Sequence, residues 1–206
     1  MSINTKVFNE AAAHIIAKAF LHYPLMQYAF EEFTEQQRAQ RLQKLFTHCV
    51  AAAEIYGGRL VLPHKQAALI WLPGNHFTLR LPEEIYSGMW RIPFECGIKP
   101  TLRLIRHDAE SEGWITKNSS PRMGYIWNIG VLPEARGKGY SRELIDVSIY
   151  QMQAMGYKEC WLKTEDAKNV TIYQKLGFTV MNEMKVKSSG ITSWAMRKMI
   201  PQKSDN

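Results

Sequence analysis

Two stretches near the N-terminus carry apolar residues at the three- and four-residue spacing of an amphipathic helix. The first comprises Val7, Phe8, Ala11, Ala12, Ile15, Ala19 and Phe20. The second comprises Leu42, Leu45, Phe46, Cys49, Val50 and Ala53. The first pattern stops before Pro24, and Gly57 follows the second, where glycine commonly ends a helix. We therefore predict one helix in each stretch.

Short runs of β-forming residues come next. Residues 59–62 and 67–72 are two such runs joined by the turn-forming residues 63–66, which predicts a hairpin. Residues 124–131 form a longer apolar run that is typical of a buried strand. The residues that share one helical face after this run are Leu144, Ile145, Ser148, Ile149 and Met152. We predict an amphipathic helix there.

Residues 76–121 are harder to interpret, because Pro82, Pro93 and Pro100 interrupt their helical patterns. We predict broken helices in this segment, with a polar loop over residues 111–121.

The remaining chain alternates between strands and a helix. Residues 159–163 predict a strand, and the residues up to Gly177 predict a short helix. Residues 178–187 and 191–198 alternate apolar and polar side chains, which predicts a closing hairpin. This order, without an internal repeat, predicts one α/β or α+β domain over residues 1–200 and a polar tail over residues 201–206.

A basic turn joins the buried strand to the amphipathic helix. Gly137 and Gly139 alternate there with Arg136, Lys138 and Arg142. The N–H groups of a helix's first turn have no intrahelical partner, and the helix dipole places partial positive charge at the same end. Because glycine lets an anion approach the backbone closely, the pattern predicts a diphosphate site.

Two other phosphate loops do not fit these residues. A dinucleotide-binding loop needs a third glycine where this chain has Arg142. The loop Gly-x-x-x-x-Gly-Lys-Ser/Thr occurs nowhere in the sequence. The alternative for the turn is a solvated basic loop without a ligand.

Composition is that of a soluble globular protein. Of the 206 residues, 46% are hydrophobic and 22% are charged. No apolar run approaches the roughly 20 residues of a membrane span, and the N-terminus lacks the apolar core of a signal peptide. We expect a cytoplasmic protein without a membrane partner. Cys49, Cys96 and Cys160 are far apart and the histidines lack metal-ligand spacing, so we expect no metal.

The formal net charge of +7 allows two interpretations, a nucleic-acid binder or an enzyme with a polyanionic ligand. The basic residues are scattered, and no nucleic-acid-binding motif accompanies them. We favour the anionic cofactor and expect no nucleic-acid partner, with nucleic-acid binding as the weaker alternative.

A second motif gives the basic turn a family context. Residues 169–178 match the pattern Asn-x-x-x-Tyr-x-x-x-Gly-Phe. Together with the turn, this segment resembles the GCN5-related N-acetyltransferase (GNAT) family. The resemblance covers residues 122–199 well and extends more loosely to the hairpin that ends at Pro73. The closing stretch 192–198 is similar to the subgroup that includes puromycin N-acetyltransferase.

The resemblance implies a GNAT-like fold, with a central mixed, mostly antiparallel sheet, a splayed parallel strand pair and flanking helices. It implies that acetyl-CoA donates its acetyl group to a primary amine of a small molecule or protein, in a ternary complex. The alternative is a non-catalytic acyl-CoA-binding sensor or scaffold module. The oligomeric state is open, and a homodimer is one candidate.

Particular residues receive roles from the same resemblance. Ile129, Gly130 and Val131 lie on the strand whose backbone pairs with the pantetheine arm, and Asn169 lies beside that arm. Tyr173 contacts the cofactor and protonates the departing thiolate, with a purely core aromatic as the alternative. The pyrophosphate loop comprises Arg136, Gly137, Lys138, Gly139, Tyr140, Ser141 and Arg142.

Three positions depart from the family pattern. Ser141 stands where Gly or Ala is common and is small enough to fit. Tyr140 stands where an aliphatic residue is common, which favours a ring that packs outward. Asp166 stands where many members have Asn, and it is a candidate N-cap for the short helix.

The acceptor side is less determined. The aromatic-rich residues 22–30 are candidates for the acceptor pocket, and Glu31 and Glu32 are candidates for attracting a cationic amine. The alternative, to which we give equal weight, is that residues 22–30 only pack between helices and that Glu31 and Glu32 are solvated surface acids. Trp90 and Trp127 are candidates for the apolar walls of this pocket.

The general base is not identified by any motif. Glu95, His107 and Asp108 are candidates because they lie in the variable central segment. For each of the three we favour a surface position, and a water chain is a further candidate for the base.

Overall fold

The computed structural model describes residues 5–62, 64 and 66–202. The α-helices are α1 (Thr5–Phe20), α2 (Pro24–Ala29), α3 (Glu35–Tyr56), α4 (Leu81–Ser87), α5 (Ile92–Cys96), α6 (Ile98–Asn118), α7 (Tyr140–Ala154) and α8 (Ala167–Lys175). Short 3-10 helices are η1 (Gly74–His76), η2 (Met89–Arg91) and η3 (Pro133–Ala135). The strands are β1 (Gly58–Val61), β2 (Ala67–Pro73), β3 (Met123–Val131), β4 (Glu159–Thr164), β5 (Thr179–Lys185) and β6 (Thr192–Met199).

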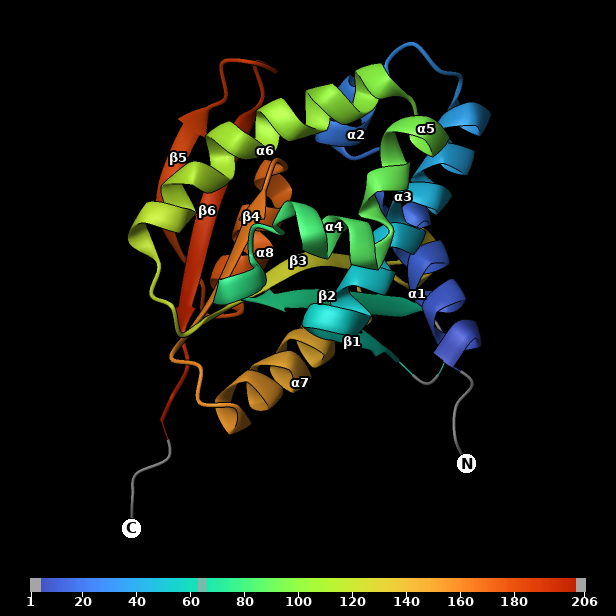
Figure 1. The fold of residues 1–206 in the computed structure, drawn as a ribbon. Coiled ribbons are helices and arrows are strands. Elements are labelled where there is room, and N and C mark those ends of the chain that lie inside the picture. The colour runs from blue at the N-terminus through green and yellow to red at the C-terminus, as the bar shows by residue number, and fades with distance from the viewer. Residues whose placement is uncertain (1–4, 63, 65, 203–206) are drawn as a thin grey trace.

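The strands form one sheet in the order β1-β2-β3-β4-β6-β5, flanked by helices (Figure 1). The pair β3–β4 is parallel, and the other neighbouring pairs are antiparallel. This mixed, mostly antiparallel sheet confirms the fold predicted from the sequence.

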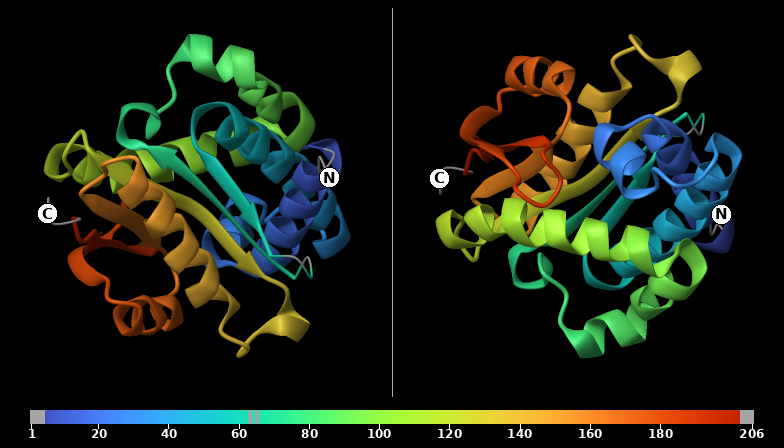
Figure 2. Two further views of the ribbon diagram at one scale, coloured as in Figure 1. Left: turned by 90° about the horizontal axis from the view of Figure 1, so that it is seen from below. Right: turned by 90° about the horizontal axis from the view of Figure 1, so that it is seen from above.

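Side chains that alternate along the strands bury both faces of the sheet. Ala68 and Ile70 of β2 pack with α1, α2 and α3 on one face. Leu69 and Trp71 of the same strand pack with α7 and α8 on the other. Helix α6 lies on the face of α1 to α3 and crosses the sheet, as the view from above in Figure 2 shows. The chain therefore forms helical layers on both faces of a buried sheet.

The parallel pair separates toward its carboxyl end. Backbone pairing between β3 and β4 runs only from Met123–Glu159 to Ile126–Leu162, although β3 continues to Val131. A bulge at Trp127 interrupts the pairing of β3 with β2 at the same level. Because a bulge bends and twists its strand, it helps to move β3 away from β4. The β4-facing backbone edge of β3 beyond Ile126 is thus free of pairing with β4.

Most predicted elements are confirmed, including the first hairpin and the closing one. Helix α3 begins at Glu35, before its apolar pattern, because Thr34 caps it. The Thr34 hydroxyl accepts from the Gln37 N–H at 3.3 Å, and the Gln37 side chain accepts from the Thr34 N–H at 3.1 Å.

The prediction of a polar loop over residues 111–121 is wrong for residues 111–118 and holds only for the short loop that follows. Helix α6 continues to Asn118, and its polar residues Asp108 and Glu112 face Lys163 of β4. The prolines also start helices rather than interrupt them, since Pro82, Pro93 and Pro100 lie in the first turns of α4, α5 and α6. None of the described helices is long and apolar enough to cross a membrane.

Candidate active site

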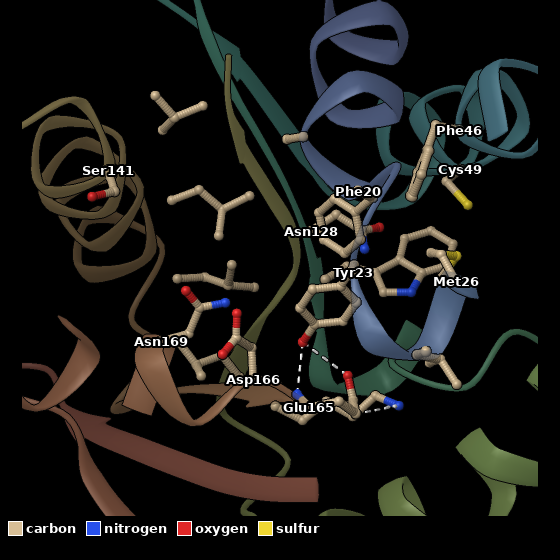
Figure 3. A pocket seen from close by; sticks show the side chains of 18 of the residues that line it. Phe20, Tyr23, Met26, Phe46, Cys49, Asn128, Ser141, Glu165, Asp166 and Asn169 are labelled. Atoms are coloured by element: carbon tan, nitrogen blue, oxygen red, sulfur yellow. Dashed lines mark hydrogen bonds and ion pairs between the residues drawn. The ribbon is translucent and has the colours of Figure 1, made fainter. Parts of the chain in front are cut away.

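A cavity of about 810 Å³ opens where β3 and β4 separate. Figure 3 shows that it extends from the N-terminus of α7 and the start of α8, across β3, to α1 and α3. We call the part near α7 and α8 the donor side. Its lining residues are Ile129, Val131, Pro133, Ala135, Arg136, Gly137, Gly139, Tyr140, Ser141, Asp166, Lys168, Asn169, Ile172 and Tyr173.

The basic turn forms an open cradle at the start of α7. Gly137 and Gly139 both have a φ of 81°, and a Cβ atom added at either would meet nothing within 4 Å. Gly139 is the N-cap of α7 and supplies no side-chain hydrogen bond to the first turn. The residues therefore fit the diphosphate of coenzyme A, since backbone donors and space occur together.

The basic side chains of the turn differ in position. Arg136 lines the cavity, whereas Lys138 and Arg142 are exposed and lie outside its lining. The guanidinium of Arg142 donates to the Lys175 carbonyl at 3.4 Å, which ties the turn to α8. Lys138 and Arg142 thus add positive charge near the cradle but do not form part of its wall.

Strand β3 supplies the middle of the donor side. Ile129 and Val131 line the cavity. Gly130 does not, because its missing side chain faces α1, where a Cβ would come within 3.0 Å of the Ala19 Cβ and the Ile16 Cα. Gly130 thus allows α1 to approach the strand closely.

Tyr140 and Ser141 open helix α7. Ser141 is half-buried at the cavity, in agreement with the expected tolerance for a small residue. The Tyr140 ring lies 4.1 Å from the His64 ring, centroid to centroid, and packs against the hydrophobic core. The expectation of an outward-packing Tyr140 is therefore wrong.

Helix α8 places Asn169 and Tyr173 one turn apart, and both line the cavity. The Asn169 amide donates to the Thr164 hydroxyl at 3.4 Å. Asp166 caps the helix by accepting from the Lys168 N–H at 3.0 Å, which confirms its predicted N-cap position. The capped helix fixes the direction in which Tyr173 points.

Tyr173 belongs both to the cavity wall and to the core around α7 and β4. Burial raises the pKa of its hydroxyl, and the charges of Glu165 and Asp166 add to this effect. The hydroxyl is consequently protonated at neutral pH and available as a proton donor.

The acceptor side lies across β3 from the donor side. Its apolar lining comprises Ala19, Phe20, Leu25, Met26, Leu45, Phe46, Cys49, Met89, Ile92, Leu104, Ile105, Ile126, Trp127 and Leu162. The predicted contribution of residues 22–30 is thus present through His22, Tyr23, Leu25 and Met26. Glu31 and Glu32 do not reach the lining, because both pair with Arg103 at 2.5 Å. Trp90 is also outside it, at 48% exposure.

A buried carboxylate, Glu165, lies between the two sides. It accepts from the Tyr23 hydroxyl at 3.0 Å and from the Ser193 hydroxyl at 3.1 Å, and its Oε1 lies 3.3 Å from the His107 Nε2. Burial works to raise its pKa, but Lys163 and the hydrogen bond from His107 outweigh burial and lower it to about 2. Glu165 is therefore ionised at neutral pH, and it lies in the cavity wall (Figure 3).

Lys163 neutralises part of this acidity. Its ammonium pairs with Asp108 and lies 3.6 Å from Glu165 and 3.8 Å from Glu112. Burial works to lower the pKa of Lys163, and the attraction of Asp108, Glu165 and Glu112 outweighs burial and raises it. Burial, together with the charge of Asp108, raises the pKa of Glu112.

The three candidates for the base occupy different surroundings. His107 is fully buried and bonds to the Ser189 hydroxyl at 2.8 Å, so the surface position favoured for it is wrong. Asp108 lines the cavity with 39% of its side chain exposed. Glu95 lies outside the lining and pairs with His48 at 3.3 Å.

Sequence reasoning missed Glu165, Lys163, Glu112 and the hydroxyl of Tyr23. Lys163 and Glu165 lie a few residues before Asn169 in the sequence. This closeness to the motif could have identified them as candidate site residues. Glu112 was hidden by the wrongly predicted loop, because only a continuous α6 brings it opposite β4.

Comparisons with known proteins find similarity to acetyltransferases. The Acetyltransferase (GNAT) family model matches residues 101–178. An uncharacterized N-acetyltransferase of Schizosaccharomyces pombe is 25% identical over 183 residues, which are 85% of this chain and 72% of that protein. A mycothiol acetyltransferase of Streptomyces griseus is 29% identical over 80 residues, which are 37% of this chain and 26% of that protein.

A solved structure is similar over nearly the whole length. The Drosophila melanogaster polyamine N-acetyltransferase has a TM-score of 0.61 and 13% identity, covering 96% of this chain and 97% of that chain. At this identity the similarity concerns the fold.

Proposed function

We propose that this chain is an acetyltransferase of the GNAT family, and that it transfers the acetyl group of acetyl-CoA directly to a primary amine in a ternary complex. The amine belongs to a small molecule or a protein, and residues 1–200 form the catalytic unit. One observation carries the proposal. Gly137 and Gly139, both with positive φ, leave space at the N-terminus of α7, next to the part of β3 that no longer pairs with β4.

The donor side supports binding of acetyl-CoA through backbone groups. The first turn of α7 offers N–H donors to the diphosphate, with Arg136 beside it. The free edge of β3 at Ile129 and Val131 is available to the pantetheine arm and to polarise a carbonyl oxygen. Asn169 lies beside the same channel.

Tyr173 is the proposed proton donor. Acetyl-CoA supplies a thioester, whose carbonyl carbon accepts the amine nitrogen while the C–S bond breaks. The Tyr173 hydroxyl gives its proton to the departing sulfur, and the amine nitrogen loses a proton as the amide forms. The hydroxyl is protonated before the transfer, and because burial raises its pKa, it gives up this proton less readily than an exposed tyrosine does.

Several sequence expectations stay predictions. These are the narrower similarity to puromycin N-acetyltransferases, a cytoplasmic location, a homodimer and the lack of a nucleic-acid partner. The second candidate function is an acyl-CoA-binding module without turnover.

Release of free thiol from acetyl-CoA, measured with and without an amine, separates these two functions. Transfer predicts thiol release that depends on the amine, together with thermal stabilisation by coenzyme A. Stabilisation without amine-dependent release would favour the binding module.

A further inference from the structure

The acceptor side of the cavity has an unequal distribution of charge. Among the described residues that line it, carboxylates occur only where α6 meets β4, at Asp108, Glu112 and Glu165. The wall formed by α1, α2, α3 and β3 is apolar apart from Lys18, His22, the Tyr23 hydroxyl and Asn128. A ligand in this space therefore contacts carboxylates at one end and apolar side chains along most of its length.

The negative charge at the acidic end of the cavity is larger than the positive charge of Lys163. Lys163 supplies one positive charge, while Asp108 and Glu165 are placed as two negative ones around it. Glu165 is committed to Tyr23 and Ser193 and has only 3% of its side chain exposed. Asp108 lines the cavity and, at 39%, has the largest exposed side-chain fraction of the three carboxylates, so it is the most accessible to an incoming cation.

Glu112 adds a charge that responds to the ligand. Its carboxylate accepts from the Tyr125 hydroxyl at 3.2 Å and is also faced by Lys163, Asp108 and Glu165. Burial raises the pKa of Glu112, and the neighbouring Asp108 adds to this effect. A cation bound nearby would favour the ionised form of Glu112.

One polar group of the apolar wall is unsatisfied. The Asn128 Oδ1 is buried, and no described residue hydrogen-bonds to it. An unpaired buried carbonyl is costly, so a ligand N–H or O–H that reaches it is bound more tightly. Asn128 and Phe20 both line the cavity (Figure 3).

We infer that the acceptor is a monocationic amine on an apolar, aromatic-sized carbon body without a carboxylate, its ammonium group directed toward Asp108 and Glu112. This inference rests on the proposed function and specifies the acceptor of the same site. Polyamines fit less well, since their further ammonium groups would lie against a wall that offers no carboxylate among the described lining residues.

Three probe amines on the wild-type protein test the inference. L-phenylalanine amide has one amine and an aromatic body, L-phenylalanine adds a carboxylate to the same body, and spermidine has several amines and no aromatic body. We expect kcat/KM for the amide to exceed that for each of the other two by about tenfold or more, because of repulsion or lost apolar contact. Equal rates for phenylalanine, or faster rates for spermidine, would overturn the inference.

Calorimetric binding of the same probes to the coenzyme A-loaded protein separates the inference from the proposed function. If no probe releases thiol but the amide binds in preference to phenylalanine and spermidine, the transfer reaction is wrong and the ligand class is right. If thiol is released without that preference, the ligand class is wrong and the reaction is right.

A charge-removing variant locates the ammonium group. Asp108→Asn is expected to raise the KM for phenylalanine amide about tenfold or more, because it removes an anion and leaves Lys163 less neutralised. The KM for acetyl-CoA should not change. The matched control is Asp146→Asn on the exposed surface of α7, outside the cavity lining, which should change neither constant. An unchanged amide KM in folded Asp108→Asn protein contradicts the placement, and the wild-type probes decide the ligand class if that variant does not fold.

Discussion

Tyr173 has a packing role and a proposed catalytic role, and a single substitution separates the two. Its ring packs at 6.0 Å from the Phe178 ring in the core, and its hydroxyl is the proposed acid for the thiolate. Tyr173→Phe retains the ring and removes the proton. We expect kcat to fall by about 10²- to 10⁴-fold at saturating acetyl-CoA, with little change in the KM for acetyl-CoA.

The control for Tyr173→Phe is Tyr150→Phe on α7, where the ring is 66% exposed. This variant should keep the wild-type rate. Normal turnover in folded Tyr173→Phe protein would leave Tyr173 with a packing role only.

Gly139 tests the donor site at a single backbone position. Gly139→Asp places a side chain at a φ of 81° and a negative charge at the start of α7. Both effects weaken diphosphate binding, so we expect the KM for acetyl-CoA to rise steeply, about tenfold or more. Calorimetric titration with coenzyme A measures the same loss without turnover.

Gly156→Asp is the matched control for Gly139→Asp. Gly156 has a φ of 78° and open space around it, but it lies beyond the opposite end of α7. The variant carries a similar backbone strain and should leave coenzyme A binding unchanged. Equal affinities in the two variants would mean that the turn does not bind the diphosphate.

Glu165 makes the stability of the protein depend on pH. Its pKa falls from the ordinary 4.5 to about 2 in the folded chain, so its ionised form stabilises the fold. This contribution is complete above the unfolded pKa and is lost as the pH falls from about 4.5 toward 2. Glu165→Gln should therefore cost about 2–4 kcal/mol of unfolding free energy at pH 7 and less at pH 3.

Urea unfolding of Glu165→Gln at a series of pH values measures this dependence. The exposed acid Glu183 provides the control, because Glu183→Gln on β5 should change stability little. A cost for Glu165→Gln that stays constant from pH 7 to pH 3 would show that its charge does not matter to folding.

Elements with a regular apolar pattern were predicted well, and those shaped by distant partners were not. Helix α1 and strand β3 could be predicted because their residues alone show the burial period. Helix α6 could be predicted only in part, because Glu112 looks like a loop residue until Lys163 of β4 faces it. The same distant pairing explains why the motifs identified the donor side while the acid end of the acceptor side was missed.

The packing of α1 on β3 gives a prediction at this scale. A Cβ at Gly130 would meet α1 at 3.0 Å, whereas a Cβ at Gly113 on α6 would meet nothing within 4 Å. We expect Gly130→Ala to lower the unfolding free energy by about 1–3 kcal/mol through overpacking. Gly113→Ala should instead raise it by about 0.5–1 kcal/mol through helix propensity. Denaturant midpoints that shift in the same direction for both would contradict this packing.

At the scale of the whole molecule, one cavity joins two sites of opposite charge. The chain carries a net charge of +7, and its basic turn lies on the donor side. The acceptor side ends at Asp108, Glu112 and Glu165 instead. On the proposed function, an anionic donor would bind at one end and a cationic acceptor at the other, with the separated strands β3 and β4 between them. This arrangement suits direct transfer between two bound molecules.

Mass spectrometry of the products formed from acetyl-CoA and phenylalanine amide tests the transfer reaction most directly. Catalysis predicts N-acetylated amide and free coenzyme A in equal amounts, at a rate that falls with Tyr173→Phe. Coenzyme A without acetylated amide, or no product although acetyl-CoA and the amide both bind, would contradict acetyl transfer to an amine.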